Sequence, residues 1–224
     1  MLLLSADTSS QHGSIALARI GGGDDCEIVD LVPLAGGTFS AQLVPQVAAV
    51  LQKHGFDKND LAAFAVVSGP GSFTGLRVGL AAIKALAEVL QKPIAAVSIL
   101  EAVAVAGGMQ GSVHAFLDAG RDEAYIGKYQ VREGRGHLVA ERLIGLVELG
   151  ELEPGSAMVT PDSSVADRAR AAGLNVLVID RPRSDAIACL GWKKIQSGQT
   201  VSPDELDANY IRRSDAEIFS KSRP

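Results

Sequence analysis

The sequence predicts a two-lobed α/β protein in which each lobe is a mixed sheet carrying helices, in the order βββαβαβα. Three observations predict this fold class. Short apolar runs bounded by turn residues indicate strands, and helical segments between later runs imply parallel pairing, because a crossover returns the chain in the same direction. The same order then begins again after Gly107-Gly108. A length of 224 residues suits one large domain or two small lobes.

The first half opens with three strands in a row, which indicate a meander, and continues with alternating helices and strands. Bounded apolar runs place strands at 2–6, 13–20, 26–34, 64–67 and 94–98, and helices at 40–54, 76–91 and 100–106. The helix at 40–54 is expected to begin at Ser40, whose hydroxyl can cap it, and to stop at Gly55. Its apolar residues then share one face, as expected for a helix that packs on a sheet.

The second half repeats this order with one less regular stretch before residue 157. Strands are predicted at 113–117, 124–132, 138–144, 157–160 and 176–179, and helices at 164–172 and 185–196. A lobe boundary is expected near the glycines at 107–111. The predicted lobes are residues 1–107, which carry the helices at 40–54 and 76–91, and residues 108–224, which are less regular and end in a C-terminal tail.

Two acidic turns occupy equivalent places in the repeat. Asp7-Thr8-Ser9 ends the first strand of one half, and Asp118-Ala119-Gly120 ends the first strand of the other. Paired turns of this kind could flank one cleft between the lobes and bind a ligand there. Alternatively, each aspartate accepts a hydrogen bond from its own backbone, as turn aspartates commonly do. The sequence leaves both interpretations open.

The glycine-rich loop at 68–75 lies between a strand and a helix, which is the usual setting of a phosphate-binding loop. A Walker loop needs a lysine after its last glycine, and no lysine follows Gly75. The dinucleotide pattern also fails, because Thr74 stands where its third glycine belongs. A loose anion site at the helix start remains open. The expected role of Ser72 and Thr74 is to cap the following helix.

The helix at 76–91 is apolar on nearly all sides. Its charged and amide residues fall on one narrow stripe, at Arg77, Lys84, Glu88 and Gln91. A sheet covers only one face of a helix, so the remaining apolar surface predicts a second contact, with a partner helix. The alternative is a helix enclosed entirely within its own domain.

Charge and residue spacing argue against several function classes. Lys and Arg number 21 and Asp and Glu number 26, which gives a net charge of −5 without any like-charge run. This balance disfavours independent binding to nucleic acid. The four histidines lack the i,i+3 or i,i+4 spacing of metal ligands, and no acid–base or nucleophile constellation emerges. We therefore expect no catalytic residue, no metal site and no cofactor of its own.

The cysteines and the start of the sequence indicate the compartment. Cys26 and Cys189 have no Cys-x-x-Cys spacing and are expected to be ordinary packing residues in a reducing environment. The apolar stretch at 2–6 is too short for a signal peptide, and no later run reaches membrane length. A cytoplasmic protein without membrane contact is expected.

The stretch from Ser68 to Gly79 closely resembles the signature of the bacterial TsaB (YeaZ) family. The turn at 7–9, the segment at 118–125 and Asn209-Tyr210-Ile211-Arg212 are similar to further family segments in the same order. The resemblance implies an actin-like or hexokinase-like (ribonuclease H-like) fold. It also implies a non-catalytic scaffold that works with a TsaD-type paralogue and a TsaE-type ATPase. That complex places threonylcarbamoyl on the adenosine next to the anticodon in tRNA.

The resemblance further implies where partners bind. The first two helices form the subunit contact in the family, so the expected interface comprises Gly71, Ser72, Phe73, Thr74, Gly75, Arg77, Leu80, Ile83 and Lys84. The isolated chain is expected to form a homodimer through the same surface, and tRNA to be reached only through the complex. ATP and a metal would belong to the partner subunits.

Two departures from the family pattern qualify this interpretation, and two different functions compete with it. The sequence has Thr38-Phe39-Ser40 where family members often carry a histidine, and Asp118-Ala119-Gly120-Arg121 where an arginine often follows Asp-Ala directly. One competing function is an independent actin-like ATPase or small-molecule kinase whose cleft is lined by Asp7, Thr8, Ser9 and Asp118. The other is a glycoprotease-like peptidase, against which the missing metal ligands argue.

Overall fold

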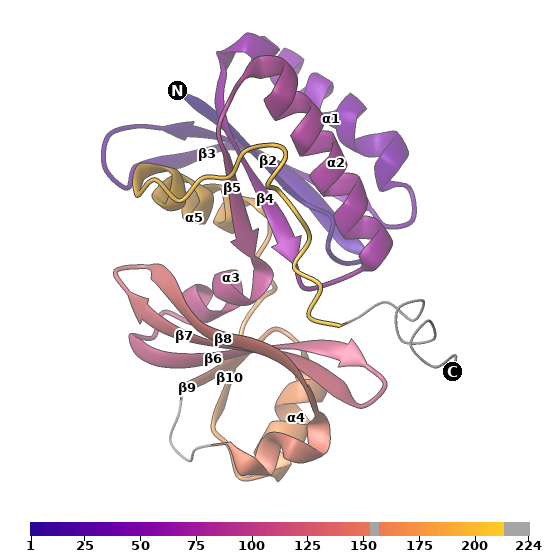
Figure 1. The fold of residues 1–224 in the computed structure, drawn as a ribbon, viewed down its shortest axis with the longest axis vertical. Helices are drawn as coiled ribbons and strands as arrows, with labels where there is room; N and C mark the ends of the chain where they lie inside the picture. The colour runs from indigo at the N-terminus through magenta and orange to yellow at the C-terminus, as the bar shows by residue number, and fades with distance from the viewer. Residues whose placement is uncertain (153–156, 213–224) are drawn as a thin grey trace.

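The computed structural model describes residues 1–152 and 157–212, and within them the chain forms two five-stranded mixed sheets (Figure 1). The first sheet has the order β3 (Cys26–Ala35), β2 (His12–Ile20), β1 (Leu2–Asp7), β4 (Leu61–Gly69) and β5 (Ile94–Ser98). The second has the order β10 (Val176–Val178), β9 (Ala157–Thr160), β6 (Gly111–Gly120), β7 (Glu123–Arg132) and β8 (Arg135–Gly145). The predicted two-lobed α/β fold with mixed sheets is confirmed.

Each sheet combines a meander with parallel crossovers. β1, β2 and β3 pair antiparallel, whereas β1, β4 and β5 pair in parallel. The second sheet repeats this scheme, with β6, β7 and β8 antiparallel and β6, β9 and β10 parallel. The helices are α1 (Phe39–Lys53), α2 (Phe73–Leu90), α3 (Ile99–Ala106), α4 (Ser163–Ala171) and α5 (Ser184–Gln196), with short 3₁₀ turns η1 (Lys58–Asp60) and η2 (Leu146–Glu151). η2 takes the place in the repeat that α1 has in the first half.

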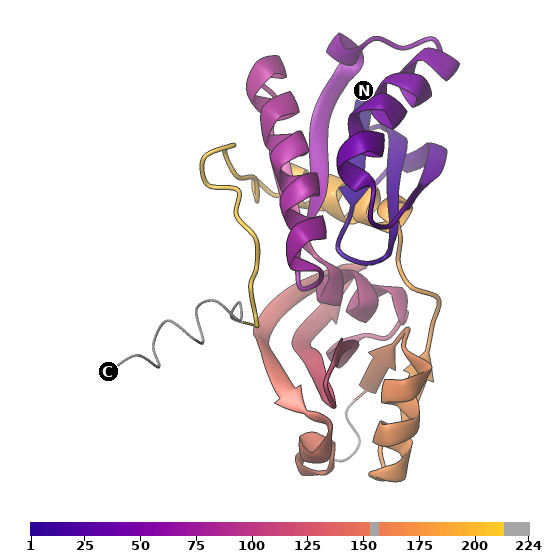
Figure 2. The ribbon, with the colours of Figure 1, turned by 90° about the vertical axis from the view of Figure 1, so that its right-hand side faces the viewer.

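The two halves of the chain exchange their last helices. α1 and α2 lie side by side on one side of the first sheet, and α5, from the second half of the chain, covers the other side (Figures 1 and 2). Conversely, α3 comes from the first half and packs against β6, β7 and β8. All six residues of β1 are buried, as expected for a strand covered on both faces. Packing therefore crosses the division at residue 107 that the repeat suggests.

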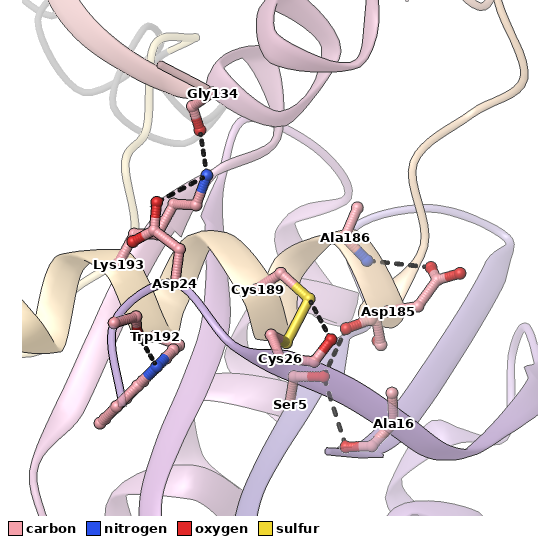
Figure 3. The surroundings of a disulfide bond; sticks show 12 residues. Ser5, Ala16, Asp24, Cys26, Gly134, Asp185, Ala186, Cys189, Trp192 and Lys193 are labelled. Atoms are coloured by element: carbon pink, nitrogen blue, oxygen red, sulfur yellow. Dashed lines mark hydrogen bonds and ion pairs between the residues drawn. A yellow bond between two sulfur atoms is a disulfide. The ribbon is translucent and has the colours of Figure 1, made fainter. Parts of the chain in front are cut away.

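α5 is fixed to the first sheet by buried polar contacts and a covalent bond. The Ser5 hydroxyl donates to the Ser184 carbonyl oxygen (2.6 Å), and the Ser184 hydroxyl donates to the Ser14 carbonyl oxygen (2.7 Å). The expectation that the two cysteines pack separately is wrong. Cys26 at the start of β3 and Cys189 in α5 form a disulfide with Cα atoms 5.5 Å apart (Figure 3). Their separation of 163 positions concealed this proximity in the sequence.

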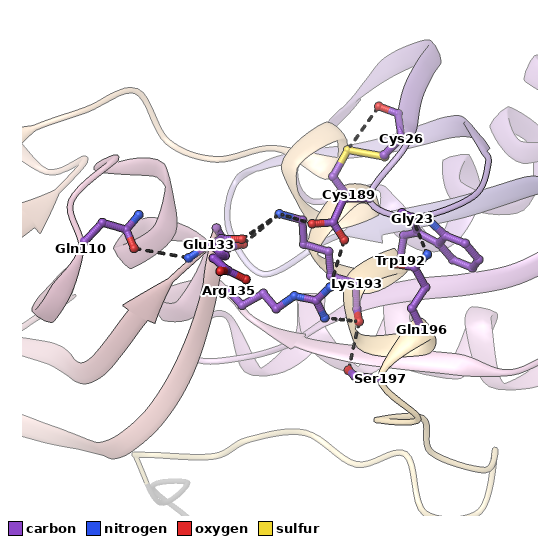
Figure 4. Close-up of polar contacts among 12 residues, drawn as sticks. Gly23, Cys26, Gln110, Glu133, Arg135, Cys189, Trp192, Lys193, Gln196 and Ser197 are labelled. Atoms are coloured by element: carbon purple, nitrogen blue, oxygen red, sulfur yellow. Dashed lines mark hydrogen bonds and ion pairs between the residues drawn. A yellow bond between two sulfur atoms is a disulfide. The ribbon is translucent and has the colours of Figure 1, made fainter.

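The loop between β2 and β3 joins this helix to the second sheet. The Trp192 indole nitrogen donates to the Gly23 carbonyl oxygen (3.1 Å), and Arg135 donates to the Lys193 carbonyl oxygen (2.9 Å) (Figure 4). Asp24 forms ion pairs with Arg135 (2.9 Å) and Lys193 (3.6 Å). These contacts hold the first sheet, α5 and the edge strand β8 together at one corner of the molecule.

Boundaries differ from the prediction by only a few residues. α2 begins at Phe73 rather than at Leu76, and the residue before α1 is Thr38, with no side-chain cap, rather than Ser40. Within the described residues, no helix is both long and apolar enough to cross a lipid bilayer.

Candidate partner-binding surface

A phosphate on the loop between β4 and α2 would need free backbone N–H groups as donors, but two of these groups are hydrogen-bonded within the chain. The Ser72 hydroxyl accepts from the Gly75 N–H (3.2 Å), so Ser72 caps α2 as predicted. The Ser72 N–H itself donates to the Ser9 carbonyl oxygen (2.7 Å). Thr74, the other predicted cap, lies inside α2. Two N–H groups at the helix start are thus already occupied, which argues against a phosphate cradle.

The glycines of the loop allow α2 to approach the turn at 7–9. A Cβ atom on Gly71 would lie 2.3 Å from the Ser9 carbonyl oxygen, and one on Gly75 would lie 2.1 Å from the Thr8 carbonyl oxygen. A Cβ on Gly79, one turn later, would lie 2.3 Å from the Thr8 hydroxyl. No real side chain fits at these separations. The glycine spacing therefore serves helix-to-turn packing, which the Thr8 hydroxyl completes by donating to the Gly75 carbonyl oxygen (2.8 Å).

The two acidic turns share one local geometry. The Asp7 carboxylate accepts from the Ser9 N–H (2.8 Å), and the Asp118 carboxylate accepts from the Gly120 N–H (2.7 Å). Each aspartate thus bonds the backbone two residues ahead, which is the second of the two interpretations that the sequence left open. The repetition of these turns has a structural explanation. A ligand role for Asp7, Thr8, Ser9 and Asp118 stays a prediction.

The two acidic turns differ in how far their residues are buried. Asp7, Thr8 and Ser9 are all buried, whereas Asp118 is exposed. Desolvation raises the pKa of Asp7 above its ordinary value, although the Ser9 hydrogen bonds and the nearby positive charge of Arg181 act in the opposite direction. Two buried polar atoms, Ser9 Oγ and Arg181 Nε, have no hydrogen-bond partner within residues 1–152 and 157–212.

An open groove of about 500 Å³ runs between α1 and α2. Its lining is mainly apolar and comprises Ser40, Leu43, Val44, Phe73, Thr74, Arg77, Val78, Ala81 and Ala82. Val44 is 52% exposed and Phe73 is 37% exposed, so both apolar side chains are open to solvent beside the groove. The groove thus carries the solvent-facing apolar surface that the composition of α2 predicts.

The predicted interface residues divide into three groups. Phe73, Thr74 and Arg77 line the groove, while Gly71, Ser72 and Gly75 shape the turn beneath it. Leu80 and Ile83 are buried in the core of the chain itself, at 6% and 0% exposure. These two side chains support α2 from the sheet side and are not available to a partner. Lys84 is half-buried farther along the helix.

Sequence reasoning assigned no residue of α1 to the interface, although the resemblance implies that the first two helices form the contact. Ser40, Leu43 and Val44 come from α1, and none was assigned to the interface. A signal was present, because Val44 is an apolar residue outside the core face of its helix. Sequence reasoning also missed Tyr210, which contacts Phe73 from far along the chain with ring centroids 4.9 Å apart.

Comparisons with known proteins decide the family. The model of a family described as "TsaD: tRNA N6-adenosine threonylcarbamoyltransferase" matches residues 33–180, more than half of the chain. The protein named tRNA threonylcarbamoyladenosine biosynthesis protein TsaB in Bacillus subtilis is 36% identical over 135 residues, and its counterpart in Haemophilus influenzae is 34% identical over 136 residues. The chain belongs to the TsaB (YeaZ) family.

The sequence alignments to the TsaB relatives are partial, whereas the structural match spans nearly the whole chain. The two TsaB alignments cover 60% and 59% of this chain and 57% and 55% of the relatives, so the chain spans about half the length of the curated relatives it matches. The structure of YeaZ from Pseudomonas aeruginosa superimposes with a TM-score of 0.74 at 24% identity, covering 93% of this chain and 100% of that one. This likeness shows the two-lobed fold of the TsaB (YeaZ) family.

Proposed function

We propose that the chain is a non-catalytic scaffold subunit in the synthesis of threonylcarbamoyladenosine in tRNA. In this proposal it binds a TsaD-type paralogue through the groove between α1 and α2, and works with a TsaE-type ATPase in the same complex. ATP and the metal belong to the partner subunits, and tRNA is reached through the complex. The names of the TsaB relatives and of the matching family support the pathway.

The exposed apolar groove is the observation that carries the scaffold role. Burying a side chain such as Val44 or Phe73 against a partner contributes about 1.5–3 kcal/mol when it becomes fully covered. The small side chains of Ala81 and Ala82 in the groove allow a partner helix to approach closely. A helix pair with this surface fits a helical partner better than a small polar substrate. The TsaD-type paralogue is the partner that the family favours.

The proposal is tested by placing a charge in the groove. Ala81→Glu and Val44→Glu change exposed side chains of α2 and α1, so both variants are expected to fold with nearly unchanged melting temperature. Each should weaken binding to the TsaD-type subunit by about 100-fold or more in titration calorimetry, because a charged and bulkier side chain would enter the apolar contact. The Ala81→Glu carboxylate would also lie one helical turn from Arg77 and engage its guanidinium within α2. Val147→Glu is the matched control, since Val147 is 88% exposed on η2 in the second lobe.

The outcomes distinguish a loss of partner binding at the groove from a general loss of folding. Size-exclusion chromatography of the isolated variants also tests whether the same surface forms a homodimer. If Ala81→Glu and Val44→Glu bind the TsaD-type subunit as tightly as the unchanged chain does, the groove is not the docking surface and the scaffold proposal fails.

A nucleotide-binding cleft between the lobes is a second candidate function. Ser9 Oγ and Arg181 Nε, which are buried and unpartnered within the described residues near Asp7, favour nucleotide binding over peptidase activity. The bonding of Asp7 within its own turn argues against a ligand at this place. Calorimetry of the isolated chain with ATP and magnesium is the test, and the absence of heat at millimolar nucleotide would remove this candidate.

A further inference from the structure

Arg77 is held in one position at the rim of the groove by two aromatic rings. Its guanidinium carbon lies 3.7 Å from the centroid of the Phe73 ring and 5.9 Å from that of Tyr210. Its Nε donates a hydrogen bond to the Tyr210 hydroxyl at 3.0 Å. Stacking of this kind fixes the plane of a guanidinium and reduces the entropy that is lost when it binds a planar anion.

Tyr210 reaches Arg77 from the last part of the described chain. We call residues 208–212 the C-terminal strap; Figure 1 shows the yellow segment that contains it running from α5 along the first sheet toward the second. The Asn209 N–H donates to the Ser68 carbonyl oxygen (2.7 Å), and the Asn209 side chain donates to Glu141 on β8 (2.5 Å). Arg212 donates to the Ala119 carbonyl oxygen (2.8 Å) at the end of β6. The strap is thus anchored on both lobes.

The signature loop is shaped to receive this strap. A Cβ atom on Gly69 would lie 2.7 Å from the Asn209 carbonyl oxygen, so only glycine lets the strap pass this close. The loop that starts α2 and the strap that holds Arg77 therefore form one packed unit. Tyr210 connects the strap to the groove through its contacts with Phe73 and Arg77.

Arg77 has no carboxylate partner in the part of the chain that the structure describes. It contacts the two rings and the Tyr210 hydroxyl there, and its side chain is exposed at the edge of an apolar groove. A partner that covers this groove would also cover the guanidinium. A covered arginine is costly unless a carboxylate pairs with it, and its planar fork suits a bidentate carboxylate.

We propose that Arg77 binds an aspartate or glutamate side chain of the TsaD-type partner, with Phe73 and Tyr210 as positioning residues that orient the guanidinium. This inference rests on the proposed function, because it concerns the same groove. It adds a charge requirement to a surface that is otherwise apolar. It also gives the C-terminal strap a role in partner binding through Tyr210.

The test is titration calorimetry of the full chain with the TsaD-type subunit. Arg77→Ala is expected to weaken binding about 30-fold or more, the scale for truncating one member of a covered charge pair. Arg77→Lys should recover only a small part of this loss, because an ammonium group lacks the planar fork. Arg132→Ala, an exposed arginine at the end of β7, is the matched control and should bind like the unchanged chain.

Positioning by Tyr210 is tested with a double-mutant cycle. Tyr210→Ala should weaken binding about 10-fold, and Tyr210→Phe, which keeps the ring and removes the hydroxyl, should weaken it less. The pair Arg77→Ala with Tyr210→Ala should bind no more weakly than Arg77→Ala alone, because Tyr210 acts through Arg77. A merely structural role for Tyr210 would instead give additive losses and a lower melting temperature.

The outcomes distinguish this inference from the proposed function. If Arg77→Ala binds normally while Ala81→Glu does not, the groove is the docking surface and the carboxylate inference is overturned. If Ala81→Glu also binds normally, the proposed function itself fails. A loss of tRNA binding with intact subunit affinity in Arg77→Ala would show that the guanidinium meets a phosphate, and would likewise overturn the inference.

Discussion

Replacing the glycines at the start of α2 tests whether close packing on the turn at 7–9 explains the signature loop. Alanine favours a helix over glycine by up to about 1 kcal/mol, so propensity alone predicts that Gly75→Ala and Gly79→Ala stabilise the chain. The structure predicts the opposite. The new Cβ would meet the Thr8 carbonyl oxygen at 2.1 Å in the first variant and the Thr8 hydroxyl at 2.3 Å in the second.

The expected magnitude follows from three contributions. Overpacking a close contact costs about 1–3 kcal/mol. Moving α2 away in Gly75→Ala also weakens the Thr8 to Gly75 hydrogen bond, a loss of about 1 kcal/mol. After subtraction of the helix propensity, the net destabilisation is about 2 kcal/mol, or about 4–8 °C in melting temperature for a chain of this size.

Thr8→Ala distinguishes the effects of the two glycine substitutions, because Gly79 approaches the Thr8 side chain and Gly75 approaches the Thr8 main chain. Once the Thr8 hydroxyl is removed, the nearest remaining atom to a Cβ on Gly79 is the Cβ of residue 8, at 3.5 Å, which is an ordinary contact. Gly79→Ala should therefore become neutral or stabilising in this background. Gly75→Ala should keep the overpacking part of its cost, because the Thr8 carbonyl oxygen that the new Cβ meets belongs to the main chain, whereas the hydrogen-bond part is already lost in Thr8→Ala.

Differential scanning calorimetry of the single and double variants measures these differences, with Gly22→Ala as a control, since a Cβ there meets nothing within 4 Å. Rescue of both variants by Thr8→Ala, or a melting temperature of Gly75→Ala at or above that of the unchanged chain, would refute the packing explanation.

Two further predictions concern the attachment of α5. Glu101 on α3 is buried and forms an ion pair with Lys194 on α5 (2.9 Å); burial raises the pKa of Glu101 and Lys194 lowers it, so Lys194→Met should raise that pKa further. An acid whose pKa is raised in the folded state destabilises the fold as the pH rises above the pKa of the unfolded chain. The stability that Lys194→Met loses relative to the unchanged chain should therefore grow from pH 4.5 to about 3 kcal/mol near pH 7 in urea titrations. A loss of stability that does not depend on pH would contradict this. The disulfide between Cys26 and Cys189 joins positions 163 apart in the sequence, for which the chain-entropy model gives a stabilisation of up to about 5 kcal/mol. A reductant should lower the melting temperature of the unchanged chain but not that of Cys26→Ser with Cys189→Ser, and two free thiols in the protein purified without reductant would contradict the bond.

Most of the element order could be predicted because it depends on local patterns. The strand at Ile94–Ser98 and the strand at Ala157–Thr160 have the predicted bounds, since apolar runs between turn residues mark them directly. The predicted repeat is present as well, and η2 occupies the stretch that was expected to be short helical or irregular. The start of α2 could not be placed from apolar periodicity, because Phe73 and Thr74 face solvent in its first turn, before the buried residues of the helix begin.

The candidate site could be predicted only in outline. The composition of α2 indicated an uncovered apolar surface, but it did not show which side chains point outward. Leu80 and Ile83 face the sheet, whereas Ala81 lines the groove, because the position of β4 decides which face of the helix is covered. Val44 became part of the site only when α1 was placed beside α2.

The sequence by itself determined the fold class, the family signature and the absence of a Walker pattern, because each depends on residues that are close together in the sequence. Only the tertiary structure decided which residues meet across long stretches of chain. It brings Tyr210 to Arg77, Asn209 to Gly69 and Cys189 to Cys26, and it exchanges α3 and α5 between the two sheets. The physical reason is that hydrophobic periodicity specifies one element at a time, whereas close approach, charge pairing and cross-links depend on how several elements pack together.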